Sequence, residues 1–471
     1  MTSQTLSIEG NRKVGTTERV ANLIVETNFA DIPKEAIDIA KDAILDCLGV
    51  ALAGSIAPVG RIIAEFVREM GGTPIAGVVG GGFKTSSSLA ALANGIMGHA
   101  LDYDDDLPVS TSIGGAVHPT APVLPAILAL GEELKVSGKE ALTAYVLGFE
   151  VETKVFYGIG WRHYVSGWHA TATMGTMGAV AAAAKLLKLD SHQTRMALGI
   201  AASEAGGLRQ NFGTMTKPFH CGNAAKNGVI AAMLAKKGFT ADDSILESQF
   251  GFCNVFGGDG QDPGIVEART TEALASPFMI LHGVVLKRYP ACLGAHRALD
   301  AILWLAQEHD ISPEEVDSIE CDLMPQVINR LDPKTGLEGK FSMAFCMAIA
   351  LLDRKAGLEQ FTDQKVLQPA AQELIKRVRH VPSVRRDDAQ RPPAVVTVRL
   401  KDGKVYSHAV EIQKGDPQVP LTKEELFAKY RECAQLVLSS ADVERSSELV
   451  SNFEDLYDVS TLMDIVTKGR R

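Results

Sequence analysis

Four carboxylates and two imidazoles lie within about twenty residues of this chain, in the segment GHALDYDDD from Gly98 to Asp106 and in the pair His118-Pro119. An apolar, alanine-rich run precedes them. Burying so many ionisable groups is costly unless they are paired, and such groupings are common at catalytic sites. The alternative is a solvated acidic loop at a helix end, because runs of like charge are usually exposed. Three further polar segments favour a site.

The first of these segments is WRHYVSGWHATAT, from Trp161 to Thr173. His169 precedes a long run of small residues that predicts a buried helix, so this imidazole is expected at or near the helix N-terminus. The helix dipole there favours a neutral imidazole and attracts anions. The alternative is that His169 merely satisfies free backbone amides at the helix start.

The second segment, from Gly206 to Gly228, contains Arg209, Lys217 and His220. We expect these three side chains on an irregular loop ahead of a helix, with Lys217 extended because it precedes a proline. A lysine on such a loop is either a surface residue or a clamp for a carboxylate. Its neighbours Arg209 and His220 favour the clamp.

The third segment, VLKRYPACLGAHRALD from Val285 to Asp300, brings Lys287, Cys292 and His296 to the junction of two expected domains. Ligand sites favour such junctions. Cys292 could be a nucleophile, but the sequence assigns it no partner base. A role in the wall of the site is the preferred interpretation.

Composition limits the class of protein. The chain has 471 residues, of which 46% are hydrophobic and 22% charged, and its net charge is −10. These values describe a globular protein with two domains, and the negative charge argues against nucleic acid or an anionic membrane as a partner. The seven cysteines are scattered, and neither a secretory signal nor a stretch long enough to span a bilayer is found. We therefore expect a cytoplasmic protein with reduced thiols.

The sequence does not match the known motifs for metal or nucleotide binding. The acidic run begins like a calcium loop, but Leu107 stands where that loop needs glycine and Ile113 where it needs glutamate. The triplet from Gly80 to Gly82 lacks the Gly-Lys-Ser/Thr of a phosphate-binding loop, and no GxGxxG unit follows a strand. The histidines show no zinc spacing. We expect neither a metal nor an organic cofactor.

Apolar periodicity predicts a mainly α protein with a smaller α+β domain. Helices are expected at 36–53, 87–100, 122–134, 138–155, 171–187, 191–205, 223–237, 293–308, 342–352 and 367–378. Strands are expected at 316–324, 394–400 and 405–412, the last two as a hairpin turning at Asp402-Gly403. Residues 17–276 and 415–471 are predicted to form one discontinuous all-helical domain. Residues 277–414 are predicted to form an inserted lid with a small antiparallel sheet, and 382–393 an exposed loop.

Together the polar segments resemble the MmgE/PrpD family, which includes 2-methylcitrate dehydratase, cis-aconitate decarboxylase and iminodisuccinate epimerase. The matching stretches are NGxxxHALDYDDD at 94–106, the pair His118-Pro119, GWHATATMG at 167–175, KPFHCGNAAKNG at 217–228 and KRYPACLGAH at 287–296. The resemblance covers roughly residues 17–460. It implies a large helical domain, a smaller lid, a homodimer and catalysis without metal or cofactor.

The resemblance also implies an active site. It gives catalytic roles to Asp102, His118, His169 and Lys217, and residues expected to bind substrate are Arg209, His220, Lys287, Cys292 and His296. Three positions depart from the decarboxylase branch: Cys292 replaces a histidine, Phe345 a tyrosine and Asp106 a threonine.

The resemblance therefore predicts a lyase that takes a proton next to a carboxylate of a di- or tricarboxylic acid. Dehydration is preferred. The alternatives, in order, are an epimerase, a decarboxylase and a non-catalytic carboxylate-binding dimer. One histidine would move the carbon-bound proton and another would protonate the leaving hydroxyl.

Overall fold

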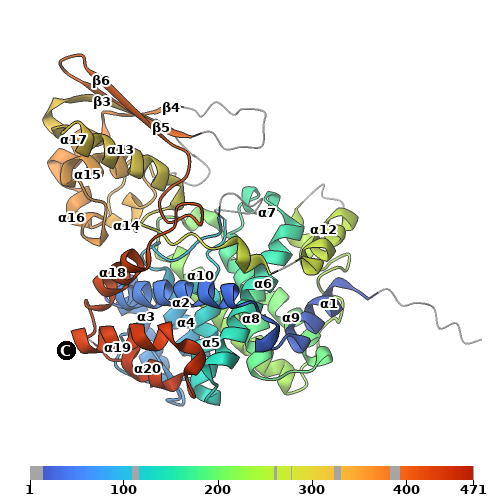
Figure 1. Ribbon diagram of the computed structural model, residues 1–471. Helices are drawn as coiled ribbons and strands as arrows, with labels where there is room; N and C mark the ends of the chain where they lie inside the picture. Colours follow the sequence, from blue (N-terminus) through green and yellow to red (C-terminus); the bar gives the residue numbers. More distant parts are fainter. Residues whose placement is uncertain are drawn as a thin grey trace, which may run out of the picture.

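The computed structural model describes residues 14–108, 116–258, 263–276, 278–322, 330–381 and 393–469. They form a large helical body and a smaller α+β body above it in the view of Figure 1. The predicted fold class, mainly helical with a small α+β part, is therefore confirmed. The predicted loop at 382–393 lies, apart from Pro393, outside the described residues, as does Ile113.

The large body contains most of the helices. They are α1 (Thr16–Glu26), α2 (Lys34–Ser55), α3 (Pro58–Met70), α4 (Ser87–His99), α5 (Thr120–Leu134), α6 (Gly138–Ile159), α7 (Arg162–Val165), α8 (Ala170–Leu186), α9 (Ser191–Glu204), α10 (Thr216–Lys236), α11 (Phe252–Gly257), α12 (Pro263–Ala275), α18 (Lys423–Ala434), α19 (Ser440–Ser451) and α20 (Ser460–Val466). All helices predicted in this region are present, but α10 begins at Thr216 rather than at residue 223. A short antiparallel pair, β1 (Ala76–Gly77) with β2 (Lys84–Thr85), was not predicted.

Small residues let the central helices approach closely, and this approach builds the site. A Cβ added at Gly95 of α4 would lie 2.7 Å from the Cα of Gly222 in α10. A side chain at either position would force the two helices apart. Because α4 ends at His99 and α10 begins at Thr216, their close packing puts the last turn of one beside the first turn of the other.

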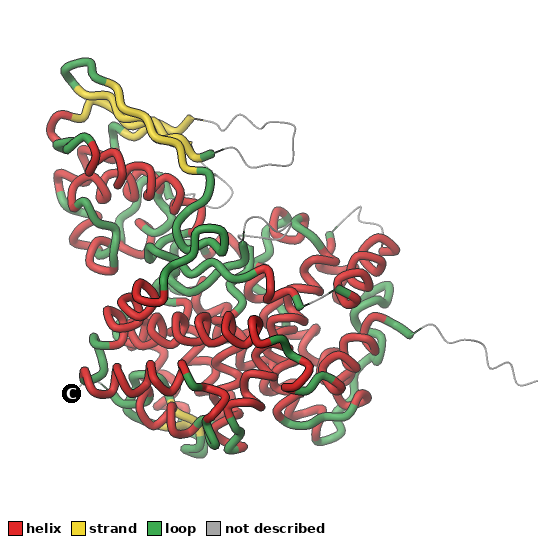
Figure 2. The backbone as a smooth tube through the Cα atoms, viewed as in Figure 1, coloured by secondary structure: helices red, strands yellow, loops and turns green. Residues whose placement is uncertain are grey.

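The smaller body has a four-stranded sheet with helices on one side, as Figure 2 shows. Its elements are α13 (His296–Glu308), α14 (Gly336–Gly339), α15 (Met343–Asp353), α16 (Asp363–Val366), α17 (Pro369–Ile375), β3 (Val316–Asp322), β4 (Val378–Val381), β5 (Ala394–Leu400) and β6 (Val405–Val410). Short 3₁₀ turns complete the described chain at Phe29–Asp31, Arg209–Asn211, Met279–His282, Leu293–Ala295, Pro313–Glu315, Leu358–Gln360 and Phe453–Asp455.

The prediction of an antiparallel sheet was wrong. The strand order is β4-β3-β5-β6, and β3 pairs with β4 in parallel, so the sheet is mixed. The reason is the connection: helices α14 to α17 lie between β3 and β4 in the chain, and parallel neighbours need such a crossover. The predicted hairpin of β5 and β6 is confirmed, with Gly403 at φ 91° in its turn.

The C-terminal helices return to the large body. In Figure 1 α18, α19 and α20 lie beside the first helices of the chain, and α18 packs along α2 while α20 contacts α5. This packing supports our proposal that 17–276 and 415–471 form one domain and 277–414 another. Among the described helices, no single one is long and apolar enough to cross a membrane. Taken together, the two helices of the bent pair α2–α3 meet that length and composition.

Candidate functional site

Asp102 stands at the centre of a buried cluster of charges. It follows the end of α4 in the left-handed region, with φ 52°, a conformation that costs a non-glycine residue free energy and is concentrated at functional sites. Its Oδ1 accepts hydrogen bonds from Lys217 Nζ at 2.9 Å and from Lys287 Nζ at 3.2 Å. Burial alone would raise the pKa of Asp102, but the two ammonium groups outweigh it and hold the pKa well below its usual range.

Lys217 reaches this carboxylate from the first turn of α10, so the prediction of an extended loop was wrong. The proline that follows it sits where the backbone N–H of a helix has no partner anyway, and such a position tolerates proline. The ammonium of Lys217 also donates to Nε2 of His99, and it faces the rings of Phe212 and Phe341. Lys217 is 4% exposed, so this cation is committed to the cluster.

Lys287 is fully buried and comes from the segment that leads into the smaller body. An isolated antiparallel bridge between Asp106 and Val285 ties that segment to the acidic run. Lys287 Nζ donates to the backbone oxygen of Asp102 as well as to its carboxylate. Burial by itself lowers the pKa of Lys287, but the neighbouring carboxylates, Asp102 foremost, raise it above its ordinary value.

Asp104 lies between two imidazoles. Its carboxylate is 2.8 Å from Nδ1 of His99 and 3.1 Å from Nδ1 of His118. Burial would raise the pKa of Asp104, yet the two histidines lower it well below the ordinary value. An ionised Asp104 can only accept hydrogen bonds, so its bond to His99 places the proton on Nδ1 of that ring. At His118 the contact is electrostatic, and the negative charge beside Nδ1 favours the same tautomer, with Nε2 as the acceptor.

Both rings are neutral near pH 7. Burial lowers the pKa of His99 to about 4, and burial together with the charge of Lys287 lowers that of His118. The Nε2 of His118 lies 3.7 Å from Asp102 Oδ1 and 3.7 Å from Asp106 Oδ2. Of the two Nε2 atoms, that of His99 already accepts from Lys217. His118 is therefore the better placed general base.

The last two carboxyls of the run differ from Asp102 and Asp104. Asp105 accepts from Thr120, and burial raises its pKa well above the ordinary value. The pKa of Asp106 is raised to about 7, first by burial and then by the negative charges of Asp102 and Asp104. Asp106, next to His118, is thus partly protonated around neutral pH.

His169 occupies the N-cap position of α8, where the sequence predicted it, but its side chain makes no capping hydrogen bond, so the alternative that it merely satisfies free amides was wrong. Its ring lies 5.9 Å from that of His99, and its Nδ1 is 3.0 Å from Nδ1 of His220. One of these two nitrogens must donate and the other accept. Burial first, and then the charge of Lys217, lowers the pKa of His169 well below its ordinary value, so this imidazole is neutral.

Arg209, Cys292 and His296 lie around the cluster without touching it. Arg209 donates to the carbonyl of Tyr164 and stacks on that ring at 3.9 Å. Burial raises the pKa of the Cys292 thiol to about 12, which suits a wall and not a nucleophile. His296 bonds the carbonyl of Ala291 and packs edge-on against a tyrosine ring. Substrate contacts by these three residues stay a prediction.

Three residues of the cluster, His99, Asp104 and Asp106, were missing from the predicted set. All three belong to the segment that opened the sequence analysis, and the only signal was their type. The sequence could not show that a helix end would turn His99 toward Lys217, which is 118 residues away along the chain.

The distances within the cluster also suit a metal ion. Ligand atoms of His99, Asp102, Asp104 and His118 all lie within 4.8 Å of one another. However, the ammonium groups of Lys217 and Lys287 already contact the carboxylate of Asp102. A divalent cation there would be repelled by two buried positive charges, so the donor set favours internal pairing.

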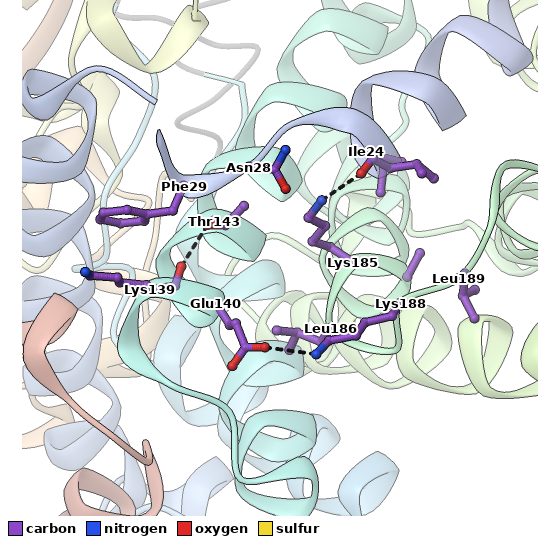
Figure 3. Close-up of a pocket in the computed structure, with 12 residues that line it drawn as sticks. Ile24, Asn28, Phe29, Lys139, Glu140, Thr143, Lys185, Leu186, Lys188 and Leu189 are labelled. Carbon is purple, nitrogen blue, oxygen red and sulfur yellow. Dashed lines mark hydrogen bonds and ion pairs between the residues drawn. The ribbon is translucent and has the colours of Figure 1, made fainter. Parts of the chain in front are cut away.

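A separate groove of about 390 Å³ lies on the large body. Figure 3 shows Lys139, Glu140, Lys185 and Lys188 around it, with an ion pair between Glu140 and Lys188 at 3.2 Å. None of the predicted site residues lines this groove.

Comparisons with known proteins agree with the motifs. The MmgE/PrpD N-terminal domain matches residues 18–263 and the MmgE/PrpD C-terminal domain matches residues 289–455. Human cis-aconitate decarboxylase is 30% identical over 96% of this chain and 94% of its own length. Cis-aconitate decarboxylase of Aspergillus terreus strain NIH 2624 is 27% identical over 99% of this chain and 98% of its own. The chain belongs to the MmgE/PrpD family.

Proposed function

We propose that this protein is a lyase that removes water from a hydroxylated di- or tricarboxylate, after taking a proton from the carbon next to a carboxylate. The observation that carries the proposal is the grouping at His118 Nε2. A neutral imidazole stands 3.7 Å from a carboxyl that holds a proton near pH 7, beside two buried ammonium groups. A base, an acid and a positively charged binding region are the parts that dehydration requires.

The two lysines supply the positive charge. Lys217 and Lys287 share one carboxylate, that of Asp102, so these three buried residues carry a net charge of +1. The ionised Asp104 offsets it over the whole cluster, but Asp104 contacts His99 and His118 and not the two ammonium groups. A substrate carboxylate bound there would gain negative charge as its neighbouring carbon loses a proton. Fixed cations stabilise that developing charge more strongly than water does.

The proton transfers then follow from the tautomers. His118 accepts the carbon-bound proton on Nε2, because Asp104 favours the proton on Nδ1. The electron pair of the broken C–H bond forms the C=C bond, and the C–O bond breaks. The carboxyl of Asp106 gives its proton to the departing hydroxyl, which leaves as water. Asp106 is now anionic and 3.7 Å from the imidazolium, from which it recovers its proton.

This scheme replaces the expected second histidine by Asp106 as the acid. His169 is neutral and engaged with His220, so it has no imidazolium proton to donate at neutral pH. We propose that His169 instead donates or accepts a hydrogen bond at the bound substrate.

Decarboxylation is the second candidate, because the curated relatives that match the chain over nearly its full length are cis-aconitate decarboxylases. The three departures seen in the sequence argue against it. Cys292 is a protonated thiol, Phe345 is a fully buried ring without a hydroxyl, and Asp106 adds a carboxyl where the decarboxylase branch has threonine. An epimerase would need only the proton transfer at carbon.

The reaction class is testable in one experiment. Citrate-like, aconitate-like and aspartate-derived acids are incubated with the enzyme in deuterated water and followed by proton NMR. We expect a hydroxylated acid to yield an alkene that absorbs in the near ultraviolet. Solvent deuterium entering an unchanged carbon skeleton would indicate an epimerase, and carbon dioxide release would indicate a decarboxylase. Either result would overturn dehydration.

The pH dependence of turnover tests the pairing of His118 with Asp106. His118 must be neutral and Asp106 protonated, so turnover falls below the lowered pKa of His118 and falls again as pH rises through about 7. Asp106→Asn, which cannot give up a proton, is expected to lose the alkaline limb and about 100-fold in kcat. Glu320→Gln on β3, a half-exposed acid, serves as the control. An unchanged alkaline limb in Asp106→Asn would exclude Asp106 as the acid.

A further inference from the structure

Lys429 is a buried lysine that contacts the backbone next to the cluster but none of the side chains of the cluster. It stands on α18, in the C-terminal part of the chain, and is 6% exposed. Its ammonium donates at 2.8 Å to the backbone oxygen of Tyr103 and at 2.8 Å to that of Lys287. A third contact, at 2.6 Å, is to the carboxylate of Asp46 on α2. The ammonium thus donates two hydrogen bonds to backbone oxygens and forms an ion pair with Asp46.

The two carbonyls belong to the segments that carry the central ion pair. Tyr103 directly follows Asp102, and Lys287 is itself the residue whose ammonium binds Asp102. The phenol of Tyr103 donates to the carbonyl of Arg288, and the ammonium of Lys429 lies 3.9 Å from the centre of the Tyr103 ring. The ammonium of Lys429 therefore joins the two segments through their backbone oxygens, while the Asp102–Lys287 contact joins them through their side chains.

Asp46 explains how a cation can be held there. Burial raises the pKa of Asp46 to about 6, while Lys429 opposes the shift, so the carboxylate is mainly ionised at neutral pH. It is fully buried in α2, and its pairing with Lys429 neutralises both charges. A buried pair of this kind contributes little net stability compared with apolar side chains. We therefore expect the Asp46–Lys429 pair to act through the groups that it holds in place.

We propose that Lys429 is a positioning residue of the active site, which sets the separation of Asp102 and Lys287 by holding the backbone oxygens of Tyr103 and Lys287 together. This role rests on the proposed function only in that Asp102 and Lys287 form the part of the site that receives the substrate carboxylate. The helix that supplies it contributes no group to the cluster itself.

The variant that tests the proposal is the double replacement Asp46→Asn with Lys429→Met. It removes both charges together, so that no unpaired charge is left in the core, and methionine keeps most of the volume of the lysine stem. The matched control is Tyr430→Phe, the next residue of α18. It loses a buried hydrogen bond to Ser446 of α19 but touches neither segment of the site.

Two readouts separate positioning from general weakening. We expect the double variant to lose about 10- to 100-fold in kcat, since a displacement of about 1 Å can cost that much. We also expect its acid limb to move to higher pH, because a displaced Lys287 no longer lowers the pKa of His118 as strongly. The other charged or titratable groups facing His118 are Asp102, Asp104, Asp106, Lys217, His99 and His169. Tyr430→Phe should change neither kcat nor the acid limb, and the thermal stability of both variants is measured so that a general weakening of the fold can be recognised.

A binding measurement keeps the test independent of turnover. Propane-1,2,3-tricarboxylate has neither a leaving hydroxyl nor a double bond, so calorimetry reports its binding alone. We expect at least a tenfold weaker Kd for the double variant and an unchanged Kd for Tyr430→Phe. Wild-type binding without turnover of any acid would contradict the proposed function and leave this inference standing. Equal Kd and equal acid limb in the double variant and the wild type would overturn it.

If the double variant does not fold, Lys429→Arg provides a second test. Arginine keeps the charge toward Asp46, but its planar fork cannot reproduce two hydrogen bonds and an ion pair that diverge from one nitrogen. We expect a folded enzyme with a smaller loss of kcat and the same direction of shift in the acid limb. A folded Lys429→Arg with the kcat, Kd and acid limb of the wild type would overturn the proposal.

Discussion

Replacing His118 by glutamine is expected to lower kcat at least ~100-fold, while the protein remains folded. Glutamine can still donate to Asp104, but it has no nitrogen that can accept a proton at neutral pH. Among the described residues, the imidazole Nε2 that lies 3.7 Å from both Asp102 and Asp106 belongs to His118. Steady-state kinetics on the acid identified by NMR measures the effect, with thermal unfolding as the check on folding.

The control for this result is another buried histidine. His163 uses both ring nitrogens, one toward the carbonyl of Phe256 and one toward Thr173, and has no contact with the cluster. His163→Gln is expected to affect stability more than kcat. Near-normal turnover in His118→Gln, His169→Gln and Lys217→Met alike would refute the assignment of the site.

Replacing Lys217 by methionine is expected to reduce kcat/KM by about 100- to 1,000-fold. The change removes the ammonium that contacts both Asp102 and His99, so the trio of Lys217, Lys287 and Asp102 falls from a net charge of +1 to zero. The region would then no longer attract a carboxylate or stabilise the charge that develops on it. The charge of Lys217 helps to lower the pKa of His118, so its removal raises that pKa. The acid limb of the pH profile should therefore move to higher pH.

Lys226 offers a matched control for this second result. It lies on the same helix, α10, and is half-buried, but it is not part of the cluster. Lys226→Met is expected to keep kcat/KM within a factor of about three of the wild type. Equal kcat/KM for Lys217→Met and Lys226→Met would mean that the positive charge at Asp102 plays no part in turnover.

The sequence was sufficient where local patterns decide the structure. The small residues after His169 predicted a buried helix, and that residue does stand at the N-cap position of α8. The rule that residues before proline avoid the helix failed at Lys217, because Pro218 falls in the first turn, where the missing N–H costs nothing. The parallel pairing of β4 also had no local signal, since it depends on how four helices cross between two strands.

Contacts between distant segments could not be read from the sequence. Asp104 looked like one more charge in a solvated run, and only the approach of α4 to α10 shows that it orients His99 and His118. Arg209 was predicted to bind substrate because it is basic and close to Lys217 in the chain. In the structure it stacks on Tyr164, and its contact with substrate stays a prediction. Residue type identified the cluster, whereas packing decides which member contacts which.

The late position of Lys429 has a consequence for biosynthesis. The ribosome releases α2, with Asp46 on a face that later becomes core, long before α18 exists. Until that helix arrives, Asp46 has no ammonium partner, and the backbone oxygens of Tyr103 and Lys287 lack the cation that joins them. The positioning proposed for Lys429 is therefore in place only after α18 has been synthesised, and a chain that terminates before α18 would keep an unpaired carboxylate at Asp46.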